Sequence, residues 1–249
     1  MVIKKYFGFF LFVILLSSCK SIQHISHTDV TYQIMKSDSS MVSDETVTNM
    51  IAPYKVQLDT VMNEVIGDVV NDLYKQRIES SLGNWVADVM LDGVKRDGYS
   101  ADIGVVNYGG LRVQSITAGP LTRGEIFELS PFDNMIVVVD IPGKILDTLF
   151  QKIASAVGWP VSRGIKMEMS NKMLTSCLVL NQPIDTNRIY KVATLDYVAN
   201  GGDDMKFLIP LTRVQTGKIL RDMLIEDALR HKAENKGITS FVEGRIINH

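Results

Sequence analysis

Two adjacent glycines and an arginine are the residues with the clearest capacity for chemistry. They lie in the segment Asn107-Tyr108-Gly109-Gly110-Leu111-Arg112. Consecutive glycines open backbone conformations that other residues rarely adopt, and they leave their amide N–H groups uncovered. Arg112 adds a planar guanidinium whose fork of donors fits a phosphate group. This segment is therefore predicted to bind an anion.

A second pair of glycines occurs far downstream, in Ala199-Asn200-Gly201-Gly202-Asp203-Asp204. Between the two pairs comes Gly119-Pro120-Leu121-Thr122-Arg123-Gly124-Glu125, whose glycines and proline are typical of a turn. We expect the segment 119–125 to have a structural role. The downstream glycine pair is expected to act together with the first glycine pair.

Helices are needed to position these loops, and three are indicated. Apolar residues recur at helical spacing after Ser81, after Gly143, and from 219 to 228. Ser81 is expected to cap the first of these helices, and Gly93 and Gly98 to bracket its end.

Short apolar runs rich in β-branched residues predict strands at 103–106, 135–141, 189–195 and 241–247, and the last is expected to close the sheet. Helices and strands mix without strict repetition. This order favours an α+β fold, a single domain with a mixed sheet and packed helices, over a doubly wound parallel sheet.

The N-terminus predicts export and a lipid anchor. Lys4 and Lys5 precede an apolar run over 6–16, which is too short to span a bilayer. The following Leu16-Ser17-Ser18-Cys19 resembles the lipobox of bacterial lipoproteins, which implies that residues 1–18 are removed and that Cys19 is acylated. An ordinary signal peptide with an incidental cysteine is the alternative.

The next residues set the expected location and organisation. The absence of acidic residues from 20–24 favours a periplasm-facing position in the cell envelope. Residues 19–55 are polar without a sustained period and are predicted to form a tether, which leaves 56–249 as one domain.

Charge and cysteine content exclude some functions. The formal net charge is −2, and removal of Lys4 and Lys5 with residues 1–18 would lower it to −4, so no affinity for nucleic acid is expected. Cys177 would then be the remaining thiol beside an acylated Cys19. Its apolar surroundings predict a buried, inert side chain.

Five segments occur in an order that resembles the C-terminal domain of the 5′-nucleotidase family. They are Glu79–Asn84, Asn107–Arg112, Leu129–Asn134, Tyr190–Thr194 and Asn200–Asp203. The resemblance runs from about Val56 to Ile246. Members of that family are bipartite: an N-terminal metallophosphoesterase domain holds two metal ions, and the C-terminal domain grips the nucleotide.

The resemblance implies that Phe132 and Tyr197 hold the base between two aromatic rings. Stacking on such a platform is worth roughly 1–3 kcal/mol per base and does not select one base over another. Base preference, and the use of sugar or cyclic nucleotides, therefore stay open. The alternative for both residues is a place in the core.

The resemblance also implies roles for polar residues. Arg112 would contact phosphate, and its alternative is a surface ion pair with a carboxylate. Asp203 would accept hydrogen bonds from ribose hydroxyls, and Asn134 would reach the base edge unless it is only a turn residue. Asp204, where the family usually has glycine, is expected to face solvent.

The remaining substrate-contact candidates form the first glycine loop itself, which consists of Asn107, Gly109 and Gly110. Asn107 would either hold this loop or touch the ligand.

Departures from the family pattern affect other positions. A family arginine is expected where Gln76 stands, so the phosphate contact is lost or moves to Arg77. Tyr108 replaces a glycine and would narrow the loop or contact a partner. Gly164, after Arg163, resembles a family segment beside the base.

This chain contains no catalytic constellation that a dinuclear phosphoesterase would need. Its histidines are His24, His27, His231 and His249, and none stands in a ligand motif. No cofactor is expected in this chain, and a pair of divalent metals is expected only in a partner.

Three hypotheses follow for function. The first is a nucleotide-binding subunit of a split 5′-nucleotidase-type phosphohydrolase, with nucleoside monophosphate as ligand and a separately encoded metallophosphoesterase as partner. The second is a non-catalytic periplasmic nucleotide-binding or scaffold lipoprotein. The third, a hydrolase acting alone, fits the sequence least well.

Overall fold

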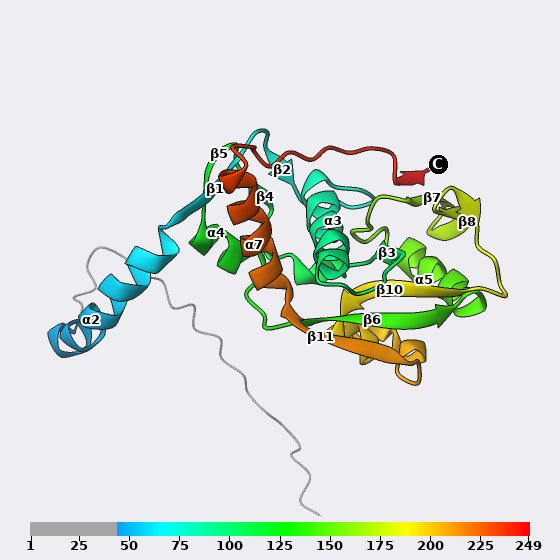
Figure 1. Cartoon of the computed structure of the whole chain (residues 1–249), viewed down its shortest axis with the longest axis horizontal. Coiled ribbons are helices and arrows are strands. Elements are labelled where there is room, and N and C mark those ends of the chain that lie inside the picture. The colour runs from blue at the N-terminus through cyan, green and yellow to red at the C-terminus, as the bar shows by residue number, and fades with distance from the viewer. Residues whose placement is uncertain (1–43) are drawn as a thin grey trace, which may run out of the picture. The chain divides into compact units, whose positions relative to one another are not determined.

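The computed structural model describes residues 44–249, and the chain folds as a compact unit over Asn49–His249 (Figure 1). The predicted signal peptide, Cys19 and the first part of the predicted tether lie outside the described residues. Within the described residues, no helix has the length and apolar character needed to cross a membrane.

A four-stranded sheet lies at the centre of this unit, in the order β11-β6-β10-β3 (Figure 1). Its strands are β3 (Ile103–Gly104), β6 (Met135–Pro142), β10 (Ile189–Leu195) and β11 (Arg213–Ile219). β10 runs antiparallel to β6 and parallel to β3, and β11 runs antiparallel to β6. The predicted strands at 135–141 and 189–195 are confirmed, as is the mixed α+β class.

Three longer helices cover the strands. They are α3 (Ser81–Arg96), α5 (Gly143–Ser155) and α7 (Leu220–Ala233). α3 packs on β3 and β10 and lies beside α7, whereas α5 packs between β6 and the second sheet (Figure 1). The apolar spacing of the sequence explains this arrangement, because the buried side chains of α3 and α5 face the sheets and those of α7 pack on both strands and α3.

The N-terminus of α3 corrects the sequence analysis, and its C-terminus agrees with it. Ser80, not Ser81, is the N-cap: its side chain accepts a hydrogen bond from the Gly83 N–H, and Ser81 instead accepts from the Tyr74 N–H. The helix ends at Arg96, between Gly93 and Gly98, so the prediction that these glycines bracket its end is confirmed. A Cβ atom at Gly93 would come within 2.0 Å of the Met223 sulfur, so this glycine permits the close approach of α7.

The second four-stranded sheet has the order β12-β7-β8-β9. It consists of β7 (Ile165–Ser170), β8 (Met173–Val179), β9 (Gln182–Pro183) and β12 (Ile246–Asn248). The expectation that 241–247 closes the central sheet is wrong. Only the last residues form a strand, and β12 pairs in parallel with β7.

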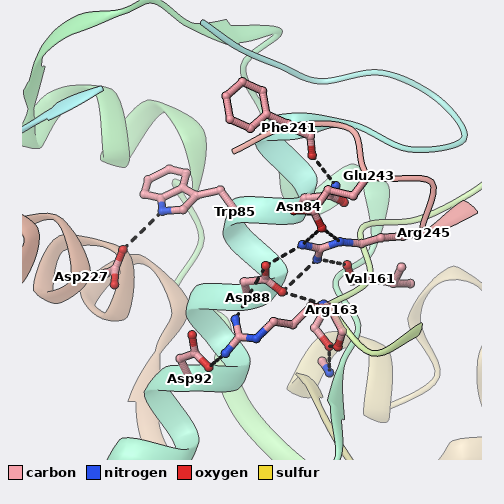
Figure 2. A network of polar contacts seen from close by, with 12 residues as sticks. Asn84, Trp85, Asp88, Asp92, Val161, Arg163, Asp227, Phe241, Glu243 and Arg245 are labelled. Carbon is pink, nitrogen blue, oxygen red and sulfur yellow. Dashed lines mark hydrogen bonds and ion pairs between the residues drawn. The ribbon is translucent and has the colours of Figure 1, made fainter. Parts of the chain in front are cut away.

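Side-chain contacts hold residues 241–245, together with one backbone hydrogen bond from the Met167 N–H to the Arg245 carbonyl. The buried Glu79 carboxylate accepts hydrogen bonds from the backbone N–H groups of Glu243 and Arg245, each at 2.7 Å. The Arg245 guanidinium donates to both oxygens of Asp88 and to the Val161 carbonyl, and Asn84 donates to the Phe241 carbonyl (Figure 2). We call this set of contacts the C-terminal clasp.

Two smaller strand pairs complete the described part of the chain. β1 (Val65–Val69) pairs with β5 (Gly119–Thr122), and β2 (Leu73–Tyr74) pairs with β4 (Ser115–Ile116). β5 leads directly into α4 (Arg123–Leu129), where Thr122 and Glu125 form a reciprocal capping box. The structural role predicted for 119–125 is therefore confirmed.

One helix lies where no regular element was expected. α2 (Glu45–Met62) covers residues 45–55 of the predicted tether. Its apolar residues do recur every three or four positions, but interspersed threonines and Pro53 obscure that period in the sequence.

Candidate functional site

One pocket of about 280 Å³ brings together three separate loops. These are the 3-10 turn η1 (Tyr108–Gly110), the turn before β6, and the short helix α6 (Asp196–Ala199). All the residues that line it are among the predicted substrate contacts: Asn107, Gly109, Gly110, Arg112, Phe132, Asn134 and Tyr197. Segments up to 90 positions apart in the sequence therefore meet at one concave surface.

The two aromatic rings are surface residues of this pocket. Phe132 and Tyr197 are each 46% exposed, so neither belongs to the core. Gly202 lies against the Tyr197 ring, where a Cβ atom would approach to 2.4 Å. A glycine at this position therefore lets the chain pass behind the ring.

Asp196 ties the two ring-bearing loops together, and sequence reasoning missed it. Its Oδ1 atom accepts hydrogen bonds from the backbone N–H of Tyr197 at 2.8 Å and from that of Met135, at the start of β6, at 3.1 Å. One carboxylate thus fixes the first turn of α6 against the loop that carries Phe132.

Asp203 lies beside the pocket and is held by two of its lining residues. The Asn107 amide donates to Asp203 Oδ2 at 2.7 Å, and the Tyr197 hydroxyl lies 3.4 Å from Asp203 Oδ1. Asp203 itself adopts a left-handed backbone conformation in the turn η2 (Gly202–Asp204). These contacts orient an exposed carboxylate next to an aromatic ring.

Asn107 has an acceptor that no described residue satisfies. The side chain is 4% exposed, and its buried Oδ1 atom has no hydrogen-bond donor among residues 44–249. An unsatisfied buried carbonyl is costly, so a donor from a bound molecule would be favourable here. Asn107 therefore both holds Asp203 and offers an acceptor.

The glycine pair works differently from the prediction. Neither Gly109 nor Gly110 has a positive φ angle, so an unusual backbone conformation is not their purpose. Gly110 is required by close approach, because a Cβ atom would lie 2.8 Å from Asn107 Oδ1. Gly109 is exposed and opens the pocket wall.

Arg112 is exposed and retains donors for a ligand. Its guanidinium lies 5.7 Å from the centre of the Phe132 ring and makes a long contact of 3.5 Å to the Gly109 carbonyl. Its backbone N–H is anchored to Leu129 at 2.9 Å. The predicted alternative, an ion pair with a carboxylate, is not formed by Arg112 within residues 44–249.

Comparison with known proteins decides the family. A family model described as "5′-nucleotidase, C-terminal domain" matches residues 60–209. The chain belongs to this family. The match includes all the lining residues and Asp203.

Relatives of this 5′-nucleotidase C-terminal domain are longer proteins. Protein UshA of Yersinia enterocolitica is 26% identical over 216 residues, which cover 83% of this chain and 38% of UshA. The trifunctional nucleotide phosphoesterase protein YfkN of Bacillus subtilis is 29% identical over 213 residues, or 78% of this chain and 14% of YfkN.

A solved structure supports the same family. The 5′-nucleotidase precursor from Thermus thermophilus superposes with a TM-score of 0.70 at 29% identity, over 82% of this chain and 43% of that one. The chain thus spans less than half the length of each of these relatives.

Three cations surround the glycine loop of this 5′-nucleotidase C-terminal domain. Lys75 and Arg77 lie over the Tyr108 ring, 4.1 Å and 3.8 Å from its centre. Burial, together with the charges of Arg112 and Arg77, lowers the pKa of Lys75. Lys75 was not a sequence candidate, because its nearness to Arg112 depends on the tertiary fold.

Two further sequence candidates, Arg77 and Gly164, lie outside the pocket lining. Arg77 stacks on Tyr108 and donates to the Ala156 carbonyl at 3.0 Å. Gly164 forms a turn before β7 with a φ of 88°, in a groove that does not include Phe132 or Tyr197. The structure does not bring Gly164 to the other candidates, since the neighbouring Arg163 is held by Asp92 of α3.

Asp204 behaves as its sequence context predicts, whereas Cys177 is partly buried, not fully buried as the sequence predicts. Asp204 is exposed and pairs with Lys152 at 2.5 Å, and this hydrogen bond lowers the pKa of Asp204. Burial raises the pKa of the Cys177 thiol to about 12, with a smaller effect of Asp147, so its reactive thiolate is suppressed at neutral pH.

Proposed function

We propose that the chain is the nucleotide-binding subunit of a split 5′-nucleotidase-type phosphohydrolase. One observation carries the proposal: two half-exposed rings, Phe132 and Tyr197, share a pocket with the Arg112 guanidinium and lie beside the Asp203 carboxylate. A planar apolar surface, a cation and an anion are the three features that a nucleotide requires from its binding site.

Each part of a nucleoside monophosphate has a partner at this site. The base would stack between Phe132 and Tyr197, and the Asn134 amide, which both donates and accepts, would meet its edge. The ribose hydroxyls would donate to Asp203. Arg112 would bind the phosphate through a charge-assisted, bidentate contact.

A separate metallophosphoesterase would supply the divalent metal pair. Within residues 44–249, no three His, Cys, Asp or Glu side chains gather in a group able to hold a metal ion. These residues therefore do not fit such a centre. The metal pair would activate the attacking water in the partner, while this chain orients the nucleotide.

We place the complex in the cell envelope. Residues 1–18 would be the signal peptide, Cys19 would carry the lipid, and residues from about 56 would form the periplasm-facing domain. Metabolic labelling with a fatty acid, compared between wild type and Cys19→Ala, tests the anchor. Equal labelling of the two proteins would exclude it.

Nucleotide binding is tested by calorimetry on the mature chain with adenosine monophosphate. Wild type should bind and Phe132→Ala should bind more weakly. An absence of heat with every nucleoside monophosphate, in both the presence and absence of a metallophosphoesterase partner, would remove the proposal.

Phosphate release then separates the subunit from a non-catalytic binding protein. A subunit should increase phosphate release by its metallophosphoesterase partner in the presence of divalent metal. Binding without any increase would assign the chain to the second class, the non-catalytic nucleotide-binding lipoproteins.

A further inference from the structure

Helix α2 exposes an unusual amount of apolar surface. None of its eighteen residues is buried, and all its large apolar side chains except the partly buried Met62 are between 47% and 74% exposed. They are Val47, Met50, Ile51, Tyr54, Val56, Leu58 and Val61. Isolated apolar residues on a surface are ordinary, but a concentration on one helix marks an interaction site.

Most of these side chains form one stripe. The intervals between Val47, Ile51, Tyr54, Leu58 and Val61 alternate between four and three residues, which keeps them on one side of the helix. Tyr54, Leu58 and Val61 also line a shallow apolar hollow together with Gln57. We call these five apolar residues the α2 stripe. Val56 lies outside it, on the opposite face.

The composition of α2 does not favour a helix standing alone. Seven of its eighteen residues are β-branched, and Pro53 inside it removes one backbone hydrogen bond. Most helical stability in proteins comes from packing of an apolar face, not from intrinsic propensity. Its stability must therefore come from packing of the stripe against another surface.

The charges of α2 argue against two kinds of surface. A helix that lies on an anionic membrane needs a basic polar face, but α2 has one basic residue, Lys55, against Glu45 and Asp59. Pairing with a second copy is usually fixed by opposite charges beside the stripe, but Met50 and Gln57 on one flank are uncharged and Lys55 is the only charged residue on the other. An uncharged apolar groove on a different protein fits these features better.

The relatives indicate which protein carries that groove. The alignment with UshA covers more of this chain than residues 63–249 supply, so it continues through α2, whereas the family model begins at residue 60. In that relative, the counterpart of α2 therefore belongs to the same polypeptide as the longer portion that this chain does not match.

The C-terminal end of α2 is also connected to the pocket. Arg123, the first residue of α4, pairs with Glu64 at 2.5 Å, and Gly124 packs against the Met62 backbone. α4 ends at Leu129, three residues before Phe132. A protein that binds α2 would thus be attached to the segment of the chain that leads to the pocket.

We propose that the α2 stripe is the docking helix that binds the metallophosphoesterase polypeptide in an apolar groove. This inference rests on the proposed function. It assigns the contact with the partner to a surface separate from the nucleotide pocket, so the two can be disrupted independently.

The test uses the tagged full-length chain in the cells that naturally produce it. After detergent extraction and capture, the bound material is assayed for phosphate release from adenosine monophosphate with added divalent metal, and with a chelator as a blank. Ile51→Glu and Leu58→Glu change the stripe. Val56→Glu is the matched control, since it makes the same kind of change on the opposite face.

We expect wild type and Val56→Glu to capture equal chelator-sensitive activity. Ile51→Glu and Leu58→Glu should each capture less by about tenfold or more, as expected for a charge placed in a packed contact. Equal activity with all four proteins, or none with wild type, would overturn the inference.

Two measurements on the purified chain identify other occupants. A sedimentation shift from dimer to monomer in Leu58→Glu would assign the stripe to a second copy. Loss of binding to anionic phospholipid vesicles in Leu58→Glu, by protein lacking the lipid anchor, would assign it to the membrane. Either result overturns the inference. Calorimetry with adenosine monophosphate reports separately on the proposed function, because the stripe variants leave the pocket intact.

Discussion

The C-terminal clasp and the candidate pocket are both rich in polar side chains, but they differ in how far those side chains are satisfied. In the clasp, Arg245 is 5% exposed and its guanidinium donates to Asp88, Glu243 and a backbone carbonyl (Figure 2). In the pocket, Asn107 Oδ1 has no donor among the described residues. Complete internal pairing indicates a structural role, and unused bonding capacity beside exposed rings indicates a ligand site.

The same contrast divides the segments that resemble the family. Glu79 and Asn84 both bind the C-terminal residues, so the segment 79–84 maintains the fold. The segments that contain Asn107 and Phe132 build the pocket instead. A shared sequence pattern thus contains structural and ligand-binding residues, and only their contacts separate the two.

The largest effect on stability is expected from the clasp. Arg245→Met would leave Asp88 without its bidentate partner, so the free energy of unfolding should fall by about 2–4 kcal/mol. Urea unfolding at pH 7 measures this change. Arg163→Met removes a more exposed guanidinium that contacts the same helix, α3. It should lower the free energy of unfolding by less than about 1 kcal/mol.

If both substitutions cost the same, the clasp would contribute no more than an ordinary surface ion pair. If folded Arg245→Met also lost nucleotide affinity, the separation between the two regions would fail. We expect its dissociation constant for adenosine monophosphate to equal that of wild type.

The reverse pattern is expected at the pocket. Phe132→Ala and Tyr197→Ala should each weaken nucleotide binding by about 1–3 kcal/mol, because each removes one face of the base sandwich. Because both rings are half exposed, the free energy of unfolding should change by less than about 1 kcal/mol. Calorimetry and urea unfolding on the same samples give the two values.

Tyr197→Phe is the matched control for this experiment. It keeps the ring and removes only the hydroxyl near Asp203, so most of the affinity should remain. A ring that can be removed without loss of affinity would instead be a surface aromatic with no role in binding.

A smaller effect is expected from the carboxylate beside the pocket. Asp203→Asn keeps the size of the side chain but replaces a charged acceptor, so affinity for a ribonucleotide should fall by about 1 kcal/mol. The loss should be smaller for the matching 2′-deoxynucleotide, which offers one hydroxyl less. Equal losses for both nucleotides would show that Asp203 does not bind the 2′-hydroxyl.

Sequence reasoning succeeded where a local pattern carries the information. The apolar runs at 135–141 and 189–195 are long enough to predict strands, and the ordered segments identified every residue that lines the pocket. The sequence does not reveal contacts between distant residues. The clasp joins Glu79 to Arg245 across 166 positions, and it replaces the strand expected at 241–245.

Local ambiguity accounts for other differences. Ser80 and Ser81 are equally good caps by residue type, and only the position of Tyr74 distinguishes them. The sequence predicts the helix end between Gly93 and Gly98, but it does not reveal the packing of Met223 against Gly93. In each case the deciding atom belongs to another element of the fold.

The smallest effect should come from Asp204, which belongs to neither region. It is exposed, and its hydrogen bond to Lys152 lowers its pKa, so its stabilising contribution is present at neutral pH and is lost as pH falls through that lowered pKa. Asp204→Asn should therefore show a barely detectable change in urea midpoint at pH 7 and none in strong acid. Asp204 follows Asp203 directly, so it is a control for the carboxylate beside the pocket. An unchanged nucleotide affinity in Asp204→Asn would confine the carboxylate requirement to Asp203. A loss as large as that of Asp203→Asn would mean that the ligand responds to general negative charge and not to a directed hydrogen bond.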